Sequence, residues 1–172
     1  NYQAGIDLSR VPCDFVIVLV SEGTRVVNPY WRQQVDQALS LGKLVGVYHY
    51  VGGGNATGEA DTFVGAVRGY LGRVALLVDW EDGSNSAWNN HGYLDTLVKR
   101  VKSQSGLSAI PIYGQYDSYP REVAAANGSP TWVKQYASMS ATGYQGTPWN
   151  EGAYQADIRQ YASSGRLPGW GG

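Results

Sequence analysis

Two carboxylates close an apolar segment at a spacing that suits acid–base chemistry. Residues 74–78 are all apolar, and Asp79 and Glu81 follow them with one residue between. Side chains of a strand alternate between its faces, so both acids point to one side, with Cα atoms roughly 6.5 Å apart. Two carboxyl groups held close in a partly apolar pocket cannot both ionise freely, so one has a raised pKa. A protonated acid beside an ionised one is the pair that cleaves a glycosidic bond.

Other interpretations of these acids stay open. A carboxylate at a wet strand end can simply begin a solvated loop, and paired carboxylates also suit Mg²⁺ or Ca²⁺. Asp7 and Glu22 end two earlier strand patterns, and each also fits a turn or helix cap. A Ser-His-Asp triad has little support, because no Gly-x-Ser-x-Gly turn is present. His49 fits a hydrogen-bonded strand histidine, and His91 fits a solvated helix start.

Strand and helix patterns alternate over the first two-thirds of the chain and would position these acids. Predicted strands cover 4–9, 15–20, 44–51, 74–80 and 109–113, then 132–136 and 156–161. Predicted helices begin at Asn28-Pro29, Thr57, His91 and Tyr119-Pro120. No long helix separates the strands after Pro130. Repeated strand–helix–strand units predict a parallel sheet or barrel, with functional groups at the carboxyl ends of its strands.

Length and charge exclude several classes of protein. The 172 residues fit one domain, 1–172, with enough chain for a core. The net charge of −1, without a basic run, argues against nucleic-acid binding. No apolar run approaches the roughly 18 residues of a membrane span. One cysteine and two histidines argue against a thiolate zinc site. We expect no metal and no cofactor.

The aromatic composition of the chain favours Tyr and Trp over Phe. The chain has 13 Tyr and 6 Trp but 2 Phe. Aromatic rings that carry an O–H or N–H group suit a surface with an apolar face and a solvated edge, as in a sugar-binding cleft. Tyr48 and Tyr50 share a face of the predicted 44–51 strand, so they are the candidates for stacking on a pyranose. Tyrosines at strand ends are also common in α/β proteins, so composition alone does not decide.

An ordered set of motifs carries a family resemblance over nearly the whole chain. In order, the motifs are Gly5-Ile6-Asp7-Leu8-Ser9, Ser21-Glu22-Gly23-Thr24, Gly46-Val47-Tyr48-His49-Tyr50, Glu59-Ala60-x-x-Phe63, Asp79-Trp80-Glu81, Ile112-Tyr113, Trp132-Val133-x-Gln135-Tyr136 and Ile158-Arg159-Gln160-Tyr161. The chain resembles glycoside hydrolase family 25, the Chalaropsis-type lysozymes of bacteria, fungi and phage endolysins.

The resemblance implies a fold, a reaction and roles. The fold is an α/β, irregular TIM-like β/α barrel that is helix-poor in its C-terminal third. The reaction cleaves the β-1,4 bond between N-acetylmuramic acid and N-acetylglucosamine. Glu81 matches the proton donor, with Asp79 as electrostatic partner and Asp7 as a further acidic position. The positions assigned to substrate binding are Tyr48, Tyr50, Tyr113 and Glu22.

The implied partner is the glycan strand of peptidoglycan, so we expect a secreted or phage-encoded monomer at the bacterial cell wall. The sequence departs from the family at Leu19 and Arg159, and it stops at Gly172, before the family's usual final strand with an Asp. We therefore expect a cleft open beside the 158–161 strand, with Gly172 near Asp7. Two alternatives remain: an inactive glycan-binding module, and a chitin-type hydrolase, which the apolar Leu77 and Ala75 disfavour.

Overall fold

The computed structural model describes residues 3–138, 142–143 and 155–168. The helices are α1 (Trp31–Ser40), α2 (Ala56–Val67), α3 (His91–Ser105) and α4 (Arg121–Asn127), with a 3₁₀ turn at Arg68–Tyr70. The strands are β1 (Phe15–Glu22), β2 (Val26–Val27), β3 (Leu44–Tyr50), β4 (Ala75–Asp79), β5 (Ile112–Gln115), β6 (Thr131–Ser138), β7 (Thr142–Gly143), β8 (Ile158–Ala162) and β9 (Gly165–Arg166).

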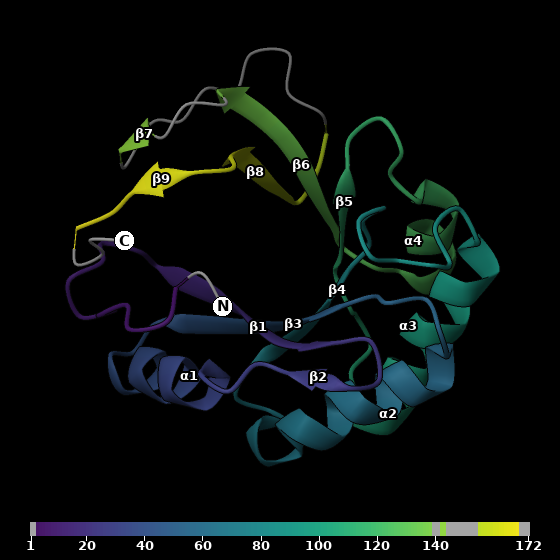
Figure 1. The fold of residues 1–172 in the computed structure, drawn as a ribbon, viewed down its shortest axis with the longest axis horizontal. Coiled ribbons are helices and arrows are strands. Elements are labelled where there is room, and N and C mark those ends of the chain that lie inside the picture. Colours follow the sequence, from purple (N-terminus) through teal and green to yellow (C-terminus); the bar gives the residue numbers. More distant parts are fainter. Residues whose placement is uncertain (1–2, 139–141, 144–154, 169–172) are drawn as a thin grey trace.

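The described residues form a mixed α/β fold around one curved sheet. Its seven strands run in the order β2-β1-β3-β4-β5-β6-β8, and every pairing is parallel except that of β2 with β1. The four helices connect successive parallel strands and cover the outer face (Figure 1). After β6 the described residues contain strands and no helix. The predicted alternation, and its change near Pro130, are confirmed.

The core lies between the sheet and the helices. Every second residue of each central strand points outward, as a parallel sheet covered by helices requires. The fully buried residues that meet there include Val20, Val47, Val78, Ile112 and Val133 from the strands and Val35, Phe63, Leu97 and Val123 from the helices. The intervening residues of the same strands point to the concave face, where the candidate site lies.

Two helix starts differ from the sequence expectation. Helix α1 begins at Trp31, because the Asn28 side chain accepts a hydrogen bond from Tyr30 N at 3.0 Å and closes a turn before the helix. Helix α2 is capped by Asn55, whose Oδ1 accepts from Gly58 N at 3.0 Å. Thr57 instead donates its hydroxyl to Asn55. The asparagine that precedes the first turn of α2 is therefore the N-cap, in place of the threonine two residues later.

Residues 4–9 do not form the predicted strand. They form turns, with Gly5 at a φ of +84°. Asp7 Oδ1 accepts from Ser9 N at 3.0 Å and from Ser9 Oγ at 2.6 Å, which bends the backbone at the expected strand end. Leu8 N donates to Gln37 on α1, so this segment is tied to a helix and not to the sheet.

The sheet is not closed within the described residues. Strand β8 pairs with β6, and β1 pairs with β3 and, at its carboxyl end, with β2. The sheet curves so that β8 and β1 face each other across the concave side (Figure 1). Among the described residues, β8 pairs neither with β1 nor with residues 4–9. Residue Gly172, expected near Asp7, lies outside the described residues.

Candidate active site

One row of residues crosses the sheet at the carboxyl ends of its strands. Adjacent pairs in the sheet register run from β1 to β8 in the order Glu22, Tyr50, Asp79, Tyr113, Trp132 and Ile158. Residues in register on neighbouring parallel strands point to the same face. Four of the candidates from the sequence are therefore neighbours on the face that the helices leave uncovered: Glu22, Tyr50, Asp79 and Tyr113.

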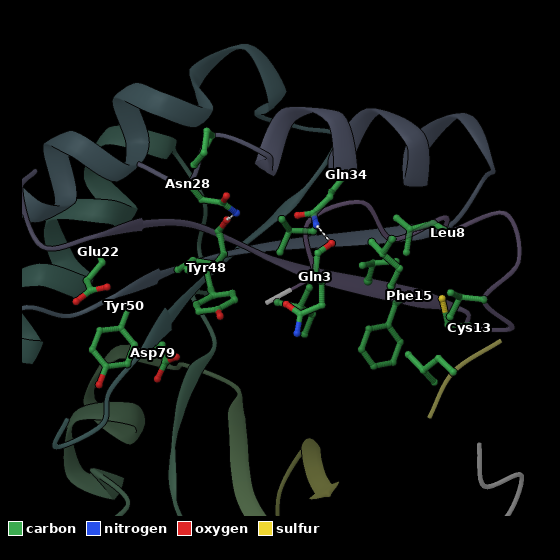
Figure 2. A pocket seen from close by; sticks show the side chains of 18 of the residues that line it. Gln3, Leu8, Cys13, Phe15, Glu22, Asn28, Gln34, Tyr48, Tyr50 and Asp79 are labelled. Carbon is green, nitrogen blue, oxygen red and sulfur yellow. Dashed lines mark hydrogen bonds between the residues drawn. The ribbon is translucent and has the colours of Figure 1, made fainter. Parts of the chain in front are cut away.

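A pocket of about 1160 Å³ occupies the concave side. Five of the nominated residues line it: Glu22, Tyr48, Tyr50, Asp79 and Glu81. Figure 2 shows Tyr48, Tyr50, Asp79 and Glu22 gathered at one end, whereas Leu8, Cys13 and Phe15 lie at the other. The pocket thus has a polar, aromatic end and an apolar end. Both tyrosines line the same pocket as Glu81.

The two carboxyl groups of the pair have different surroundings. Asp79 is 7% exposed, and its buried Oδ1 has no hydrogen-bond partner among the residues that the structure describes. Burial, and then the charge of Glu81, raise the pKa of Asp79 well above its usual value, although Lys134 acts in the opposite direction. The Glu81 side chain is 22% exposed and forms an ion pair with Lys134 Nζ. Burial and the neighbouring charge therefore favour the protonated form of Asp79.

Two tyrosines of β3 flank the pair. Burial raises the pKa of Tyr48, and the charges of Asp79 and Glu81 raise it further, so its phenol stays a hydrogen-bond donor. The same causes raise the pKa of Tyr50. The Tyr50 hydroxyl packs against Gly83, where an added Cβ would lie 2.3 Å from it. The loop after β4 therefore holds this ring in place.

Two nominated residues do not line the pocket. Tyr113 is buried beside Asp79, donates its hydroxyl to Gln160 on β8 and contacts the Trp132 ring edge-on at 4.6 Å. Asp7 lies outside the pocket lining, in the turn described above. The hydroxyl and then the N–H of Ser9 lower the pKa of Asp7, so the turn-cap interpretation describes its contacts. The catalytic role assigned to it stays a prediction.

Sequence reasoning missed two polar residues at the site. Lys134 was left unspecified inside the Trp132–Tyr136 motif, although strand alternation places it on the face of Trp132. Ser84 donates its hydroxyl to Glu22 Oε1 at 2.8 Å and so joins the β4 loop to the end of β1. No local pattern signals that contact, because the two residues lie 62 positions apart.

Beneath the loops of the site lies a buried polar network around Glu59. This carboxylate accepts hydrogen bonds from His49 Nε2 at 2.8 Å, from Tyr93 at 2.7 Å and from the backbone N–H groups of residues 52, 53 and 54. His49 Nδ1 meets Ser21 Oγ at 2.9 Å. Glu59, His49 and Ser21 are almost fully buried, and Tyr93 is half-buried. His49 is thus the hydrogen-bonded strand histidine that the sequence indicated, and the network anchors the loop after β3.

Within the described ranges, no group of three or more His, Cys, Asp or Glu side chains gathers as a metal site. No helix in that part of the chain is long and apolar enough to cross a bilayer.

The fold and the site define a class of protein. A curved parallel sheet, with an Asp–Glu pair at the carboxyl end of one strand inside an aromatic pocket, is typical of glycoside hydrolases. The chain belongs to the glycosyl hydrolases family 25, whose model matches residues 1–170. The resemblance read from the motifs is confirmed.

Solved structures share the fold. The catalytic domain of endolysin ply40, from bacteriophage P40 of Listeria monocytogenes, superposes with a TM-score of 0.75 at 21% identity, covering 98% of this chain and 84% of that one. The lysozyme of Streptomyces coelicolor gives 0.74 at 20% identity, covering 98% and 83%. The uncharacterized protein YegX of Escherichia coli K12 is 26% identical over 162 residues. The match covers 88% of this chain and 57% of YegX, so the chain spans little more than half of that relative.

Proposed function

We propose that this chain is a muramidase of the lysozyme type, which hydrolyses the β-1,4 bond between N-acetylmuramic acid and N-acetylglucosamine in peptidoglycan. The observation that carries the proposal is the convergence of Asp79 and Glu81 on one pocket with Tyr48 and Tyr50. Family membership and the names of the structural neighbours, an endolysin and a lysozyme, support this substrate. Residues 1–172 act as one catalytic domain, built on the irregular barrel of the family.

Glu81 is the proton donor in this proposal. Its side chain is more exposed than that of Asp79, so a glycosidic oxygen can reach it. A glycan in the pocket displaces water from Glu81, which disfavours its charge and moves the shared proton from Asp79 to Glu81. Glu81 then protonates the leaving oxygen, and the ionised Asp79 stabilises positive charge that develops on the sugar ring. The two carboxyl groups titrate as a coupled pair.

The remaining pocket residues bind the glycan. Tyr48 and Tyr50 offer ring faces to the C–H surface of a pyranose and hydroxyls to its polar edge. Glu22, already bonded to Ser84, has a second oxygen for a sugar hydroxyl. The partner is therefore the glycan strand of the cell wall, and the protein acts there as a monomer outside the producing cell.

Replacement of the donor tests the assignment. Glu81→Gln is nearly isosteric, so circular dichroism should show an unchanged fold. Clearing of a bacterial cell-wall suspension should fall by a factor on the order of 100 or more, as is usual when a general acid is lost. Mass analysis of the released muropeptides should show N-acetylmuramic acid at the new reducing ends. A Gln variant that clears walls at a near-normal rate would refute the role of Glu81.

One observation favours a second function. The Lys134–Glu81 ion pair stabilises the carboxylate form of the proposed acid, which is also what an inactive glycan-binding module would tolerate. Co-sedimentation with purified cell walls, measured beside turbidity, separates the two. A binding module sediments with the walls and releases no muropeptides, whereas a muramidase releases them.

A further inference from the structure

A cation from a distant part of the chain meets the carboxylate pair. Lys134 lies on β6, 53 residues after Glu81, and its Nζ donates to Glu81 Oε1. The two side chains are 20% and 22% exposed, so water screens the ion pair only in part. The other described ion pairs with lysine or arginine, Lys99–Asp95 and Arg100–Asp61, are more exposed and lie on the helices, away from the pocket.

The sheet register explains how Lys134 reaches Glu81. Lys134 is in register with Gln115 on β5 and with Gln160 on β8, one pleat beyond the row that contains Asp79. Glu81 lies two residues past Asp79, just beyond the carboxyl end of β4. Strand β5 lies between β4 and β6 in the sheet, and its Gln115 directs its amide to Asp117 at 3.4 Å. The lysine side chain therefore crosses β5 to reach the acid.

The contact opposes the work of a general acid. An acid catalyst has to hold a proton before it can donate one, and an ammonium group in contact favours the ionised carboxyl. Burial disfavours the charge of Lys134, yet the hydrogen bond to Glu81 prevails and raises the pKa of the lysine above its usual value. The contact with Glu81 therefore favours the charged form of Lys134.

The other groups that face the pair carry no positive charge. They are Asp79 on β4, Glu22 on β1, Tyr48 and Tyr50 on β3, Tyr113 on β5 and Tyr136 on β6, and β8 adds the neutral Gln160. Each carboxylate or phenolate among them would favour the protonated form of Glu81. In the described part of the chain, Lys134 is the cation that these interactions join to the site.

We propose that Lys134 is a positioning residue whose ammonium group, in contact with Glu81, opposes protonation of that acid and thereby sets the upper pH limit of the hydrolysis. The proposal rests on the proposed function, because it assigns Glu81 the donor role. It predicts an enzyme that works best in acid, since Glu81 carries its proton more often there. Loss of the cation extends activity toward higher pH.

Three variants test this. Lys134→Met removes the charge but keeps most of the aliphatic chain, Lys134→Arg keeps the charge, and Lys99→Met removes an exposed lysine from α3 as a control. Rates of wall clearing are measured from about pH 3 to about pH 9 to define both limbs of the profile. The alkaline limb of Lys134→Met should move upward by about one to three pH units, the usual effect of one contacting opposite charge. The Arg and Lys99 variants should keep the limb of the unmodified protein.

The outcomes separate the inference from the proposed function. If Lys134→Met is active with an unshifted limb, the inference is wrong and the muramidase assignment stands. If it is folded but inactive at every pH, while the Arg variant is active, Lys134 binds substrate directly and the inference is again wrong. If the unmodified protein clears no walls, the proposed function fails. Carbon NMR of labelled glutamate then still follows the ionisation of Glu81, whose signal is assigned with the Glu81→Gln variant. If the titration midpoint of Glu81 does not rise in Lys134→Met, the inference is wrong.

Discussion

Glu59 offers a sharp test of how the loops of the site are held. Its Oε2 accepts from His49 Nε2 and Gly52 N, and its Oε1 accepts from Tyr93 and the N–H groups of residues 53 and 54. Glu59→Gln places an NH₂ group on one side, which turns two or three acceptor contacts into donor–donor contacts. His49 can relieve one of them by changing its tautomer. Each remaining unpaired donor costs about 1–3 kcal/mol, so we expect a loss of about 2–4 kcal/mol.

The pKa of the same group gives an independent magnitude. Burial alone would raise it, but the hydrogen bonds from His49, Tyr93 and Gly52 prevail and lower the pKa of Glu59 from 4.5 to about 2. That difference corresponds to at most about 3 kcal/mol of stability. Because the folded-state pKa is depressed, the contribution is complete above pH 4.5 and is lost as the pH falls toward 2. The two estimates agree.

Chemical denaturation at pH 7 and at pH 3 measures the effect. At pH 7, Glu59→Gln should lower the free energy of unfolding by about 2–4 kcal/mol, or the melting temperature by roughly 4–16 °C for a chain of this size. The gap between the two proteins should narrow at pH 3. Asp61→Asn on the same helix is the matched control, because Asp61 is exposed and water screens its ion pair with Arg100. A Gln variant as stable as the control would refute the anchoring role.

Two further predictions concern the concave face. Asp79→Asn should reduce wall clearing but stabilise the fold at neutral pH, because a raised pKa means that folding opposes ionisation of Asp79. Thermal melts should show that this gain in stability vanishes below about pH 3.8, where Asp79 is protonated in both the folded and the unfolded state. Equal stability of the two proteins at pH 7 would contradict it. Tyr48→Phe should weaken binding of a peptidoglycan oligosaccharide by about 0.5–1.5 kcal/mol, the net value of one hydrogen bond. Titration calorimetry measures this change, and an unchanged affinity would show that the Tyr48 hydroxyl does not bond to the glycan.

The features that followed from local rules could be predicted from the sequence. Alternation along one strand placed Asp79 and Glu81 on a common face, and the same rule paired Tyr48 with Tyr50. Strand–helix–strand repetition then gave a parallel sheet with these residues at its carboxyl edge. Each of these inferences needs one short segment or one general rule of connection, and the structure agrees with them.

Contacts between distant segments could not be predicted in this way. The Asp7 segment reads as a strand by composition, but hydrogen bonds to Ser9 and to Gln37 on α1 bend it into turns. Lys134 occupies an unremarkable place in its motif, and its contact with Glu81 depends on a flexible side chain that spans a neighbouring strand. Such contacts are decided by tertiary packing, which no periodicity records.

Two buried carboxylates show why surroundings, and not burial, decide the chemistry of a site. Glu59 and Asp79 are both almost completely buried, and burial raises the pKa of each. Glu59 meets a donor on every side, so its charge is stabilised and its proton is lost; Asp79 has an oxygen without a partner and a second acid two residues away, so its proton is retained. The first arrangement fixes a loop. The second favours a protonated carboxyl group next to the residue that we propose donates the proton.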